Sequence, residues 1–233
     1  MDWQILAERL FGSNHAIRAD GNLLHGSATF DDSDIAVIGT TGHVAIGFEL
    51  ALAQARLVLD EIARHPGRAI LLLIDTQGQL LRRRDELLGI NRSMAHLGCC
   101  IDLARRAGHR VVGLVYDQAL SGGFITSGLI ADACYALPEA EIRVMGIPAM
   151  ARVTKIPEDR LIELSKANPV FAPGVQNYVA MGGVRALWSG DLAACLRAAL
   201  AESPTDDIRA VDGAARGGRR LAASVVQRIL RAP

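Results

Sequence analysis

Two short, uninterrupted apolar runs are the clearest pattern along the chain. Residues 69–74 read AILLLI and residues 111–116 read VVGLVY. Runs that are apolar at every position are typical of parallel strands that are buried on both faces of a sheet. A segment with helical spacing of apolar residues precedes the first run, and another separates the two runs. Strands that alternate with helices in this way predict an α/β fold with parallel crossover connections.

Both helical segments end at residues that terminate helices. The first segment covers residues 47–65 and stops at Pro66-Gly67, and the second stops at Gly108. In the first helix we expect one face to carry Leu50, Ala53, Leu57 and Ile62. In the second helix the corresponding face carries Ile90, Met94, Leu97, Ile101 and Ala104.

The rest of the chain is predicted as shorter elements. Residues 2–11 form an amphipathic helix, and residues 15–42 alternate short apolar runs with Gly, Asn and Asp turns, as antiparallel strands do. After the second apolar run we expect a helix that reaches about Ala131, and then two short strands within residues 134–146. Further expected elements are helices at residues 148–155, 157–167, 191–202 and 219–232, a Pro-rich loop at 167–174 and a linker at 203–218.

Composition limits the kinds of partner. The 233 residues include 25 basic and 25 acidic side chains, so the formal net charge is zero. A balanced charge gives no support for binding to nucleic acid or to a membrane surface, and we expect neither partner. The N-terminus lacks the pattern of a signal peptide, and no apolar stretch is long enough to cross a bilayer. A cytoplasmic location is therefore expected.

Several common catalytic motifs are missing from the sequence. No G-x-G, Gly-Lys pair, G-x-S-x-G or H-E-x-x-H occurs. These absences disfavour dinucleotide binding, phosphate loops, nucleophile elbows and zinc-peptidase chemistry. The four cysteines form no C-x-x-C pair and the six histidines are scattered, so no metal site is expected.

Glycine marks the turn that follows each apolar run. Gly78 ends the turn DTQG after the first run, and Gly122 and Gly123 lie in SGGFITSG after the second run. If the two strands are neighbours, both turns lie at the same end of the sheet. Glycine lets a ligand approach the free backbone N–H groups of a helix N-terminus, and such donors stabilise an oxyanion such as a thioester enolate. The alternative interpretation is that these glycines allow a strand and a helix to pack closely.

Longer motifs around the glycine turns resemble a known family. The segments LLLIDTQG (71–78), LSGGFITSG (120–128) and ADACYALPEAEIRVMG (131–146) resemble the carboxyltransferase branch of the crotonase superfamily, and IPAMARVTK (147–155) and NPVFAPGVQNYVAMGGVRALWSGD (168–191) are similar to the gamma subunits of malonate decarboxylases. Gln77 stands where that branch has a proline. The resemblance weakens before about residue 30 and after Glu202. We therefore expect a carboxyltransferase-like domain at residues 1–202, followed by a linker and a C-terminal helix at residues 203–233.

The resemblance implies a fold and an activity. The fold is of the crotonase/ClpP type, an α/β arrangement of repeated strand-strand-helix units with helices packed on the sheets. With a homologous beta subunit, in a heterodimer or heterotetramer, a gamma subunit forms the site that converts malonyl-S-acyl carrier protein to acetyl-S-acyl carrier protein and carbon dioxide. The thioester is carried on the phosphopantetheine of a partner acyl carrier protein, and no cofactor is expected on this chain.

Two other functions remain open at this point. A carboxyltransferase subunit with the same architecture would pass the carboxyl group to biotin. A non-catalytic subunit would only stabilise its beta partner.

The resemblance also assigns roles to individual residues. The catalytic oxyanion donors are the peptide groups at Gly78, Gly122 and Gly123. Ser121 and Thr126 are expected to line the substrate pocket, although a helix-capping role for Ser121 is an alternative.

Charged residues near these motifs have two interpretations each. Arg152 and Lys155 either hold a carboxylate or the carrier phosphopantetheine, or belong to a solvated helix turn. The run from Arg82 to Arg84 either meets an acidic carrier protein or lies in a solvated loop. Thr126 occupies the position of the catalytic glutamate of single-chain hydratases, which disfavours a hydratase and leaves the proton donor to the enolate unassigned.

Overall fold

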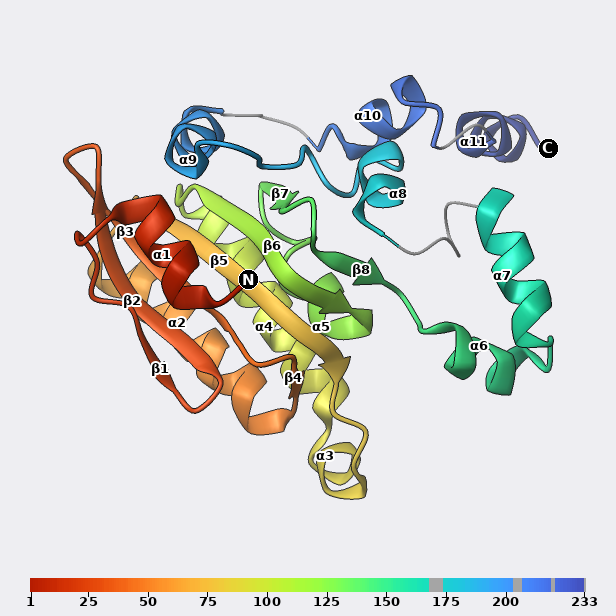
Figure 1. Cartoon of the computed structure of the whole chain (residues 1–233), viewed down its shortest axis with the longest axis horizontal. Coiled ribbons are helices and arrows are strands. Elements are labelled where there is room, and N and C mark those ends of the chain that lie inside the picture. Colours follow the sequence, from red (N-terminus) through yellow and green to blue (C-terminus); the bar gives the residue numbers. More distant parts are fainter. Residues whose placement is uncertain (168–173, 203–206, 219–220, 233) are drawn as a thin grey trace.

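The chain folds around one eight-stranded sheet (Figure 1). The computed structural model describes residues 1–167, 174–202, 207–218 and 221–232. The main path of the sheet has the order β1-β2-β3-β5-β6-β7, while β4 pairs with β5 and β8 pairs with β6. The strands are β1 Arg18–Asp20, β2 Leu23–Phe30, β3 Ser33–Thr40, β4 Val44–Ile46, β5 Ala69–Gln79, β6 Val111–Leu120, β7 Ala133–Ala136 and β8 Glu141–Arg143.

The sheet combines antiparallel and parallel pairing. β1, β2 and β3 form an antiparallel meander, whereas β3, β5, β6 and β7 are parallel neighbours. The two apolar runs are adjacent central strands, with Ile70 opposite Val111. The prediction of buried parallel strands joined by helical crossovers is confirmed.

Helices cover both faces of the sheet (Figure 1). Apolar side chains of α2 and α4 pack on one face, mainly against β3 and β5. Side chains of α1, α8 and α9 pack on the other face, in the larger cluster of buried apolar residues. The described helices are α1 Trp3–Phe11, α2 Phe48–Arg64, α3 Arg83–Leu88, α4 Ile90–Arg106, α5 Ser121–Ile125, α6 Ile147–Thr154, α7 Glu158–Ala167, α8 Val175–Ala180, α9 Leu192–Ala201, α10 Arg209–Ala215 and α11 Ala222–Leu230.

The two long helices have the lengths that the sequence pattern predicts, but they differ in how deeply the predicted apolar face is buried. In α4 the expected apolar face is buried as predicted. In α2 the four expected side chains are only half-buried, and the buried residues are Ala51, Gln54, Ala55 and Val58. Three of the expected side chains still pack against the core, Leu57 and Ile62 in the cluster that includes α4 and Leu50 in the cluster that includes Ile46.

The helix after the second apolar run is much shorter than predicted. α5 ends at Ile125 rather than near Ala131. The hydroxyls of Thr126 and Ser127 donate to the carbonyls of Gly122 and Gly123, at 2.9 and 2.7 Å. Such side-chain bonds compete with the continuation of a helix. The chain then turns through Gly128 toward β7.

The segment expected as a linker at residues 203–218 contains α10. Asp212 of this helix forms an ion pair with Arg185 at 3.0 Å, and Arg216 donates to the carbonyls of Val179 and Val184. These contacts hold the described part of the segment against the neighbouring loop. This part is therefore not an extended linker, although its composition is polar. Most of the Pro-rich loop at 167–174 lies outside the described residues. Among the helices of the described segments, none is both long and apolar enough to span a membrane.

Candidate functional site

β5 and β6 both change neighbours at the same level of the sheet. Their parallel register runs regularly from Ile70 to Ile74 and then shifts before Thr76 pairs with Ala119. Beyond this irregularity β5 pairs with the short strand β4, and β6 pairs with the short strand β8. Gly78 lies in this end of β5, and Gly122 and Gly123 follow this end of β6 directly, so the expectation that both turns lie at one end of the sheet is confirmed.

Gly78 brings the two turns into contact. Its φ of +101° is in the region that favours glycine, and a Cβ atom at this position would lie 2.8 Å from the Cβ of Ser121 and 3.1 Å from the Leu120 carbonyl oxygen. A residue with a side chain would therefore push the turns apart. Glycine is required here by both backbone conformation and space.

The N–H group of Gly78 already has an acceptor. It donates to Oγ1 of Thr76 at 3.0 Å, and the Thr76 hydroxyl donates to the Val44 carbonyl at 2.7 Å. This chain of bonds joins the turn to β4. Of the three glycines predicted as donors, Gly78 is thus the one whose amide is occupied by a neighbouring side chain.

Gly122 and Gly123 lie in the first turn of α5, where N–H groups have no acceptor within the helix. A Cβ atom at Gly123 would lie 3.0 Å from Thr76 Oγ1 and 3.1 Å from Ile46 Cδ1. Packing of α5 against β4 and β5 therefore explains Gly123. At Gly122 a Cβ atom would meet only the ends of two flexible side chains, Gln79 at 3.2 Å and Met94 at 3.4 Å.

The hydroxyls predicted to line a pocket donate to the backbone. Ser121, which has a φ of +49°, donates through Oγ to the Val144 carbonyl at 2.7 Å and so ties the start of α5 to the chain after β8. Its side chain makes no capping bond to α5. Thr126 donates to the Gly122 carbonyl at 2.9 Å. Both side chains are half-buried beside the glycine pair.

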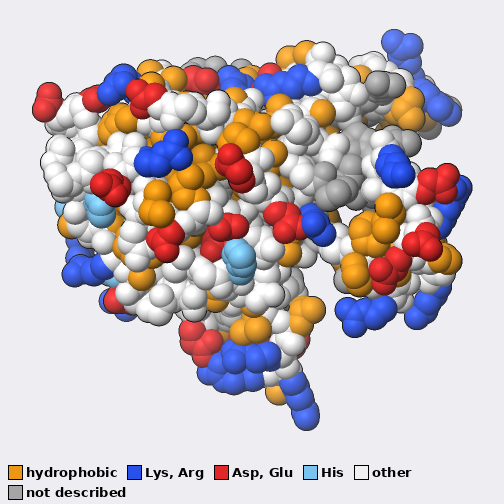
Figure 2. All heavy atoms as spheres, in the orientation of Figure 1, with side chains coloured by type: hydrophobic (Ala, Val, Ile, Leu, Met, Phe, Trp, Pro, Cys, Tyr) orange, Lys and Arg blue, Asp and Glu red, His pale blue; other side chains and the backbone are white. Residues whose placement is uncertain are grey.

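Arg152 and Lys155 lie apart from the glycine turns. They are exposed on α6 and at its C-terminus, and α6 packs against α7. Figure 1 shows this helix pair beyond β8, and Figure 2 shows a hollow between the pair and the main body. Within the described segments neither cation forms an ion pair. The structure therefore leaves both charges available to a partner but does not bring them into the glycine site.

The arginine run is partly used inside the chain. Arg82 pairs at 2.7 Å with Asp85, a fully buried residue whose other oxygen accepts from the backbone N–H of Phe48 at the start of α2. Arg84 pairs with Glu49. Figure 2 shows basic side chains gathered over the tip that carries α3. Within this run, Arg83 is the arginine that forms no ion pair with another described residue.

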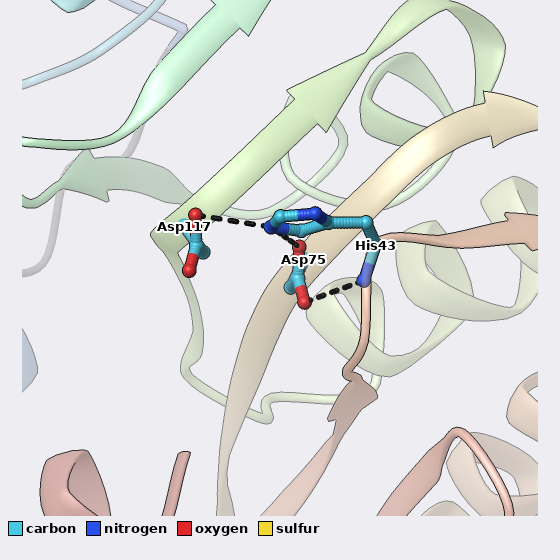
Figure 3. Close-up of side chains that lie close together, drawn as sticks. All are labelled: His43, Asp75 and Asp117. Carbon is cyan, nitrogen blue, oxygen red and sulfur yellow. Dashed lines mark hydrogen bonds and ion pairs between the residues drawn. The ribbon is translucent and has the colours of Figure 1, made fainter. Parts of the chain in front are cut away.

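A cluster that the sequence analysis did not indicate lies beside these turns (Figure 3). It consists of His43 in the turn before β4, Asp75 in β5 and Asp117 in β6. Burial raises the pKa of Asp75, against the opposing effect of His43. Burial acts in the same direction on Asp117, but bonds from the amino terminus and from His43 lower its pKa overall. No motif joins these residues in the sequence, so only the fold reveals them.

Comparison with known proteins defines the class of this fold. A transcarboxylase 12S core with hydrolysed methylmalonyl-coenzyme A is similar with a TM-score of 0.71 and 20% identity, over 88% of this chain and 43% of that chain. At this identity the likeness establishes the fold alone. The chain has a crotonase-type carboxyltransferase fold, as expected.

More similar proteins identify the family. A Pseudomonas malonate decarboxylase hetero-tetramer in complex with coenzyme A matches with a TM-score of 0.76 and 26% identity, over 97% of each chain. The Pseudomonas MdcD-MdcE hetero-dimer matches with a TM-score of 0.75 and 26% identity, over 97% of this chain and 96% of that chain. Residues 41–232 match the model of the malonate decarboxylase gamma subunit family. The chain belongs to this family.

One curated relative carries a different activity. The malonyl-S-ACP:biotin-protein carboxyltransferase MADD of Malonomonas rubra is 37% identical over 146 residues. The match covers 60% of this chain and 50% of the relative, so the chain spans about half the length of this relative.

Proposed function

We propose that this chain is the gamma subunit of a malonate decarboxylase. With a homologous beta subunit it forms the site that converts malonyl-S-acyl carrier protein to acetyl-S-acyl carrier protein and carbon dioxide. The match of residues 41–232 to the gamma subunit family carries this proposal. The hetero-dimeric and hetero-tetrameric Pseudomonas relatives support a beta partner, and we expect the complex in the cytoplasm.

The chemistry requires a site that accepts negative charge on oxygen. When the carbon–carbon bond to the carboxylate breaks, its electron pair moves into the thioester carbonyl and produces an enolate oxygen. Preorganised N–H donors stabilise that charge in the transition state. The N–H groups of Gly122 and Gly123 are the donors we assign on this chain, since the Gly78 amide is bonded to Thr76. Gly78 then serves mainly to hold the two turns together.

The remaining groups have supporting roles in this proposal. Ser121 and Thr126 hold the backbone of the donor turn through their bonds to Val144 and Gly122. The phosphopantetheine belongs to the acyl carrier protein, and no cofactor on this chain is required for decarboxylation. We assign the exposed cations Arg152 and Lys155, on α6 and at its C-terminus, to the carrier's phosphate rather than to the acyl group. Water or the beta subunit supplies the proton to the enolate.

Transfer of the carboxyl group to biotin is the second candidate function, and the identity with MADD favours it. In that reaction the carboxyl group leaves the malonyl thioester and forms a new bond to a biotin nitrogen. The same N–H donors would stabilise the same enolate, so the glycine turns do not distinguish the two functions. The acceptor of the carboxyl group does.

Reconstitution tests these functions. The chain is combined with its beta partner and malonyl-S-acyl carrier protein, and acetyl thioester and carbon dioxide are measured with and without avidin. Turnover that needs both subunits and is unchanged by avidin supports the decarboxylase. Turnover that needs a biotinyl acceptor and is blocked by avidin supports carboxyl transfer. Full turnover by the beta subunit alone would leave this chain a stabilising role and contradict both catalytic proposals.

A further inference from the structure

The cluster of His43, Asp75 and Asp117 brings three ligand-type atoms to one point (Figure 3). Nε2 of His43 lies 3.6 Å from Oδ1 of Asp75 and 3.2 Å from Oδ1 of Asp117. The three atoms lie within 4.8 Å of one another. They come from three separate segments of the chain, and Asp75 and Asp117 both lie where the register of β5 with β6 shifts.

The two separations from Nε2 of His43 match the spacing of ligands around a metal ion. Charged hydrogen bonds between nitrogen and carboxylate oxygen are shorter, about 2.7 to 2.9 Å. Ligands about 2.1 Å from a tetrahedral ion lie roughly 3.4 Å from one another. The imidazole thus stands between the two carboxylates at ligand spacing, and its contact with Asp117 at 3.2 Å is at the long end of the range for a hydrogen bond.

The buried carboxylate of Asp75 is held in a fixed orientation. Its Oδ2 accepts the backbone N–H of His43 at 2.9 Å, and its Oδ1 accepts the backbone N–H of Gln118 at 3.3 Å. The side chain is only 4% exposed. Groups that orient a ligating carboxylate from behind are a regular part of metal sites. The fixed carboxylate directs Oδ1 toward the imidazole.

The other two side chains leave the cluster accessible from solvent. The side chain of His43 is 53% exposed and that of Asp117 is 37% exposed. Oδ2 of Asp117 accepts from the amino group of Met1 at 2.9 Å, which leaves its Oδ1 facing the imidazole. An ion can therefore enter from outside, and water can complete its coordination.

We propose that His43, Asp75 and Asp117 bind one divalent first-row cation, through Nε2 and the two Oδ1 atoms. An imidazole with two carboxylates is a ligand set that Zn²⁺ and its neighbours accept. The ion joins the turn before β4 to β5 and β6. His43 directly precedes Val44, whose carbonyl accepts a hydrogen bond from the Thr76 hydroxyl. The oxygen of the same hydroxyl accepts the N–H of Gly78. Binding of the ion therefore stiffens the strand ends that carry the glycine turns.

Calorimetric titration with ZnCl₂ tests the proposal on the full chain after treatment with a chelator. A Cys99→Ser background removes the exposed thiol. We expect one saturable site whose affinity falls more than about tenfold in both His43→Gln and Asp117→Asn, since even outer partners of ligands contribute about 10- to 100-fold. His25→Gln is the matched control, because the acidic group that His25 pairs with among the described residues is Asp20, at 2.7 Å, and this variant should bind Zn²⁺ like the background.

Thermal melting of the same proteins separates loss of the site from loss of the fold. Zn²⁺ should raise the melting temperature of the background and of His25→Gln, and leave the two site variants unchanged. Cooperative melting without Zn²⁺ verifies that a variant is folded. If His43→Gln does not fold, Asp117→Asn alone decides the result. Absence of a saturable site, or equal affinity in the background and Asp117→Asn, overturns the proposal.

Discussion

A Cβ atom at Gly78 would lie 2.8 Å from the Cβ of Ser121, a separation too short for two side-chain-bearing residues. The end of β5 and the start of α5 therefore form one unit. Gly78 is needed for the close contact between these two segments. It would have this role whether or not its N–H group binds a substrate.

Gly78→Ala should destabilise the chain more than a glycine substitution in open space. Gly108→Ala is the matched control, because Gly108 has a φ of +91° and nothing within 4 Å of an added Cβ. Backbone strain alone should cost about 1 kcal/mol at Gly108, and strain with the clash about 3 kcal/mol at Gly78. Urea unfolding of both variants measures the difference. Equal losses would show that the contact with Ser121 relaxes freely.

The two adjacent glycines of α5 should respond differently to a side chain. Gly123→Ala is expected to lower the free energy of unfolding by about 1 to 3 kcal/mol, since the new methyl group meets Thr76 and Ile46. Gly122→Val should fold, because its neighbours are the flexible ends of Gln79 and Met94. If the Gly122 amide binds the enolate oxygen, bulk beside it should reduce turnover about a hundredfold or more.

Urea unfolding and a turnover assay of the reconstituted complex, on the same preparations, provide the two readouts. A folded Gly122→Val complex with full turnover would exclude this amide as an oxyanion donor. Unchanged stability of Gly123→Ala would contradict the packing explanation.

Carrier docking by the arginine run is best tested at Arg83 alone. Arg82 and Arg84 are already paired, and removal of Arg82 would leave the buried Asp85 without its ion-pair partner. Arg83→Ala should lower the rate at low carrier concentration by roughly two- to fivefold and flatten its salt dependence, because surface charges act mainly on encounter. Arg18→Ala, on the edge strand β1, is the control. An identical salt dependence in wild type and Arg83→Ala assigns the run to a solvated loop.

Asp85 should make stability depend on pH. Its bonds with Arg82 and with the Phe48 N–H hold its pKa below the usual value. Because the folded pKa is the lower one, the ionised carboxylate stabilises the fold above the ordinary aspartate pKa. This contribution disappears as pH falls through the folded value. Asp85→Asn should therefore melt at a lower temperature than wild type at neutral pH, and the two curves should converge in acid. A melting difference that stays constant down to about pH 3 would contradict this role.

The sequence was sufficient for the elements whose pattern is long and local. The runs at residues 69–74 of β5 and 111–116 of β6 are apolar throughout because both faces are covered, and the face of α4 repeats over several turns. Short elements were missed or mistaken where particular side-chain contacts decide. α10 forms where Asp212 meets Arg185, and α5 ends early because Thr126 and Ser127 bond to the glycine carbonyls.

The candidate site also has parts that the sequence reveals and parts that depend on the fold. Motifs identified the two glycine turns, since each follows directly from its strand. The contact between Gly78 and Ser121, and the occupied amide of Gly78, depend on the register of β5 with β6 and could not be inferred from either motif. The His43 cluster takes one residue from each of three segments, so it leaves no local pattern at all.

The change of neighbours along β5 and β6 implies two levels of local stability within single strands. Residues 70–73 of β5 are hydrogen-bonded between two long neighbours, whereas residues 76–79 have the three-residue strand β4 on one side. Opening of β4 breaks few bonds and need not disturb the centre of the sheet, so amide protons near Gly78 should exchange with solvent faster than those near Leu71. The end of each strand that leads to the glycine turns can then adjust to a partner while the other end holds the fold.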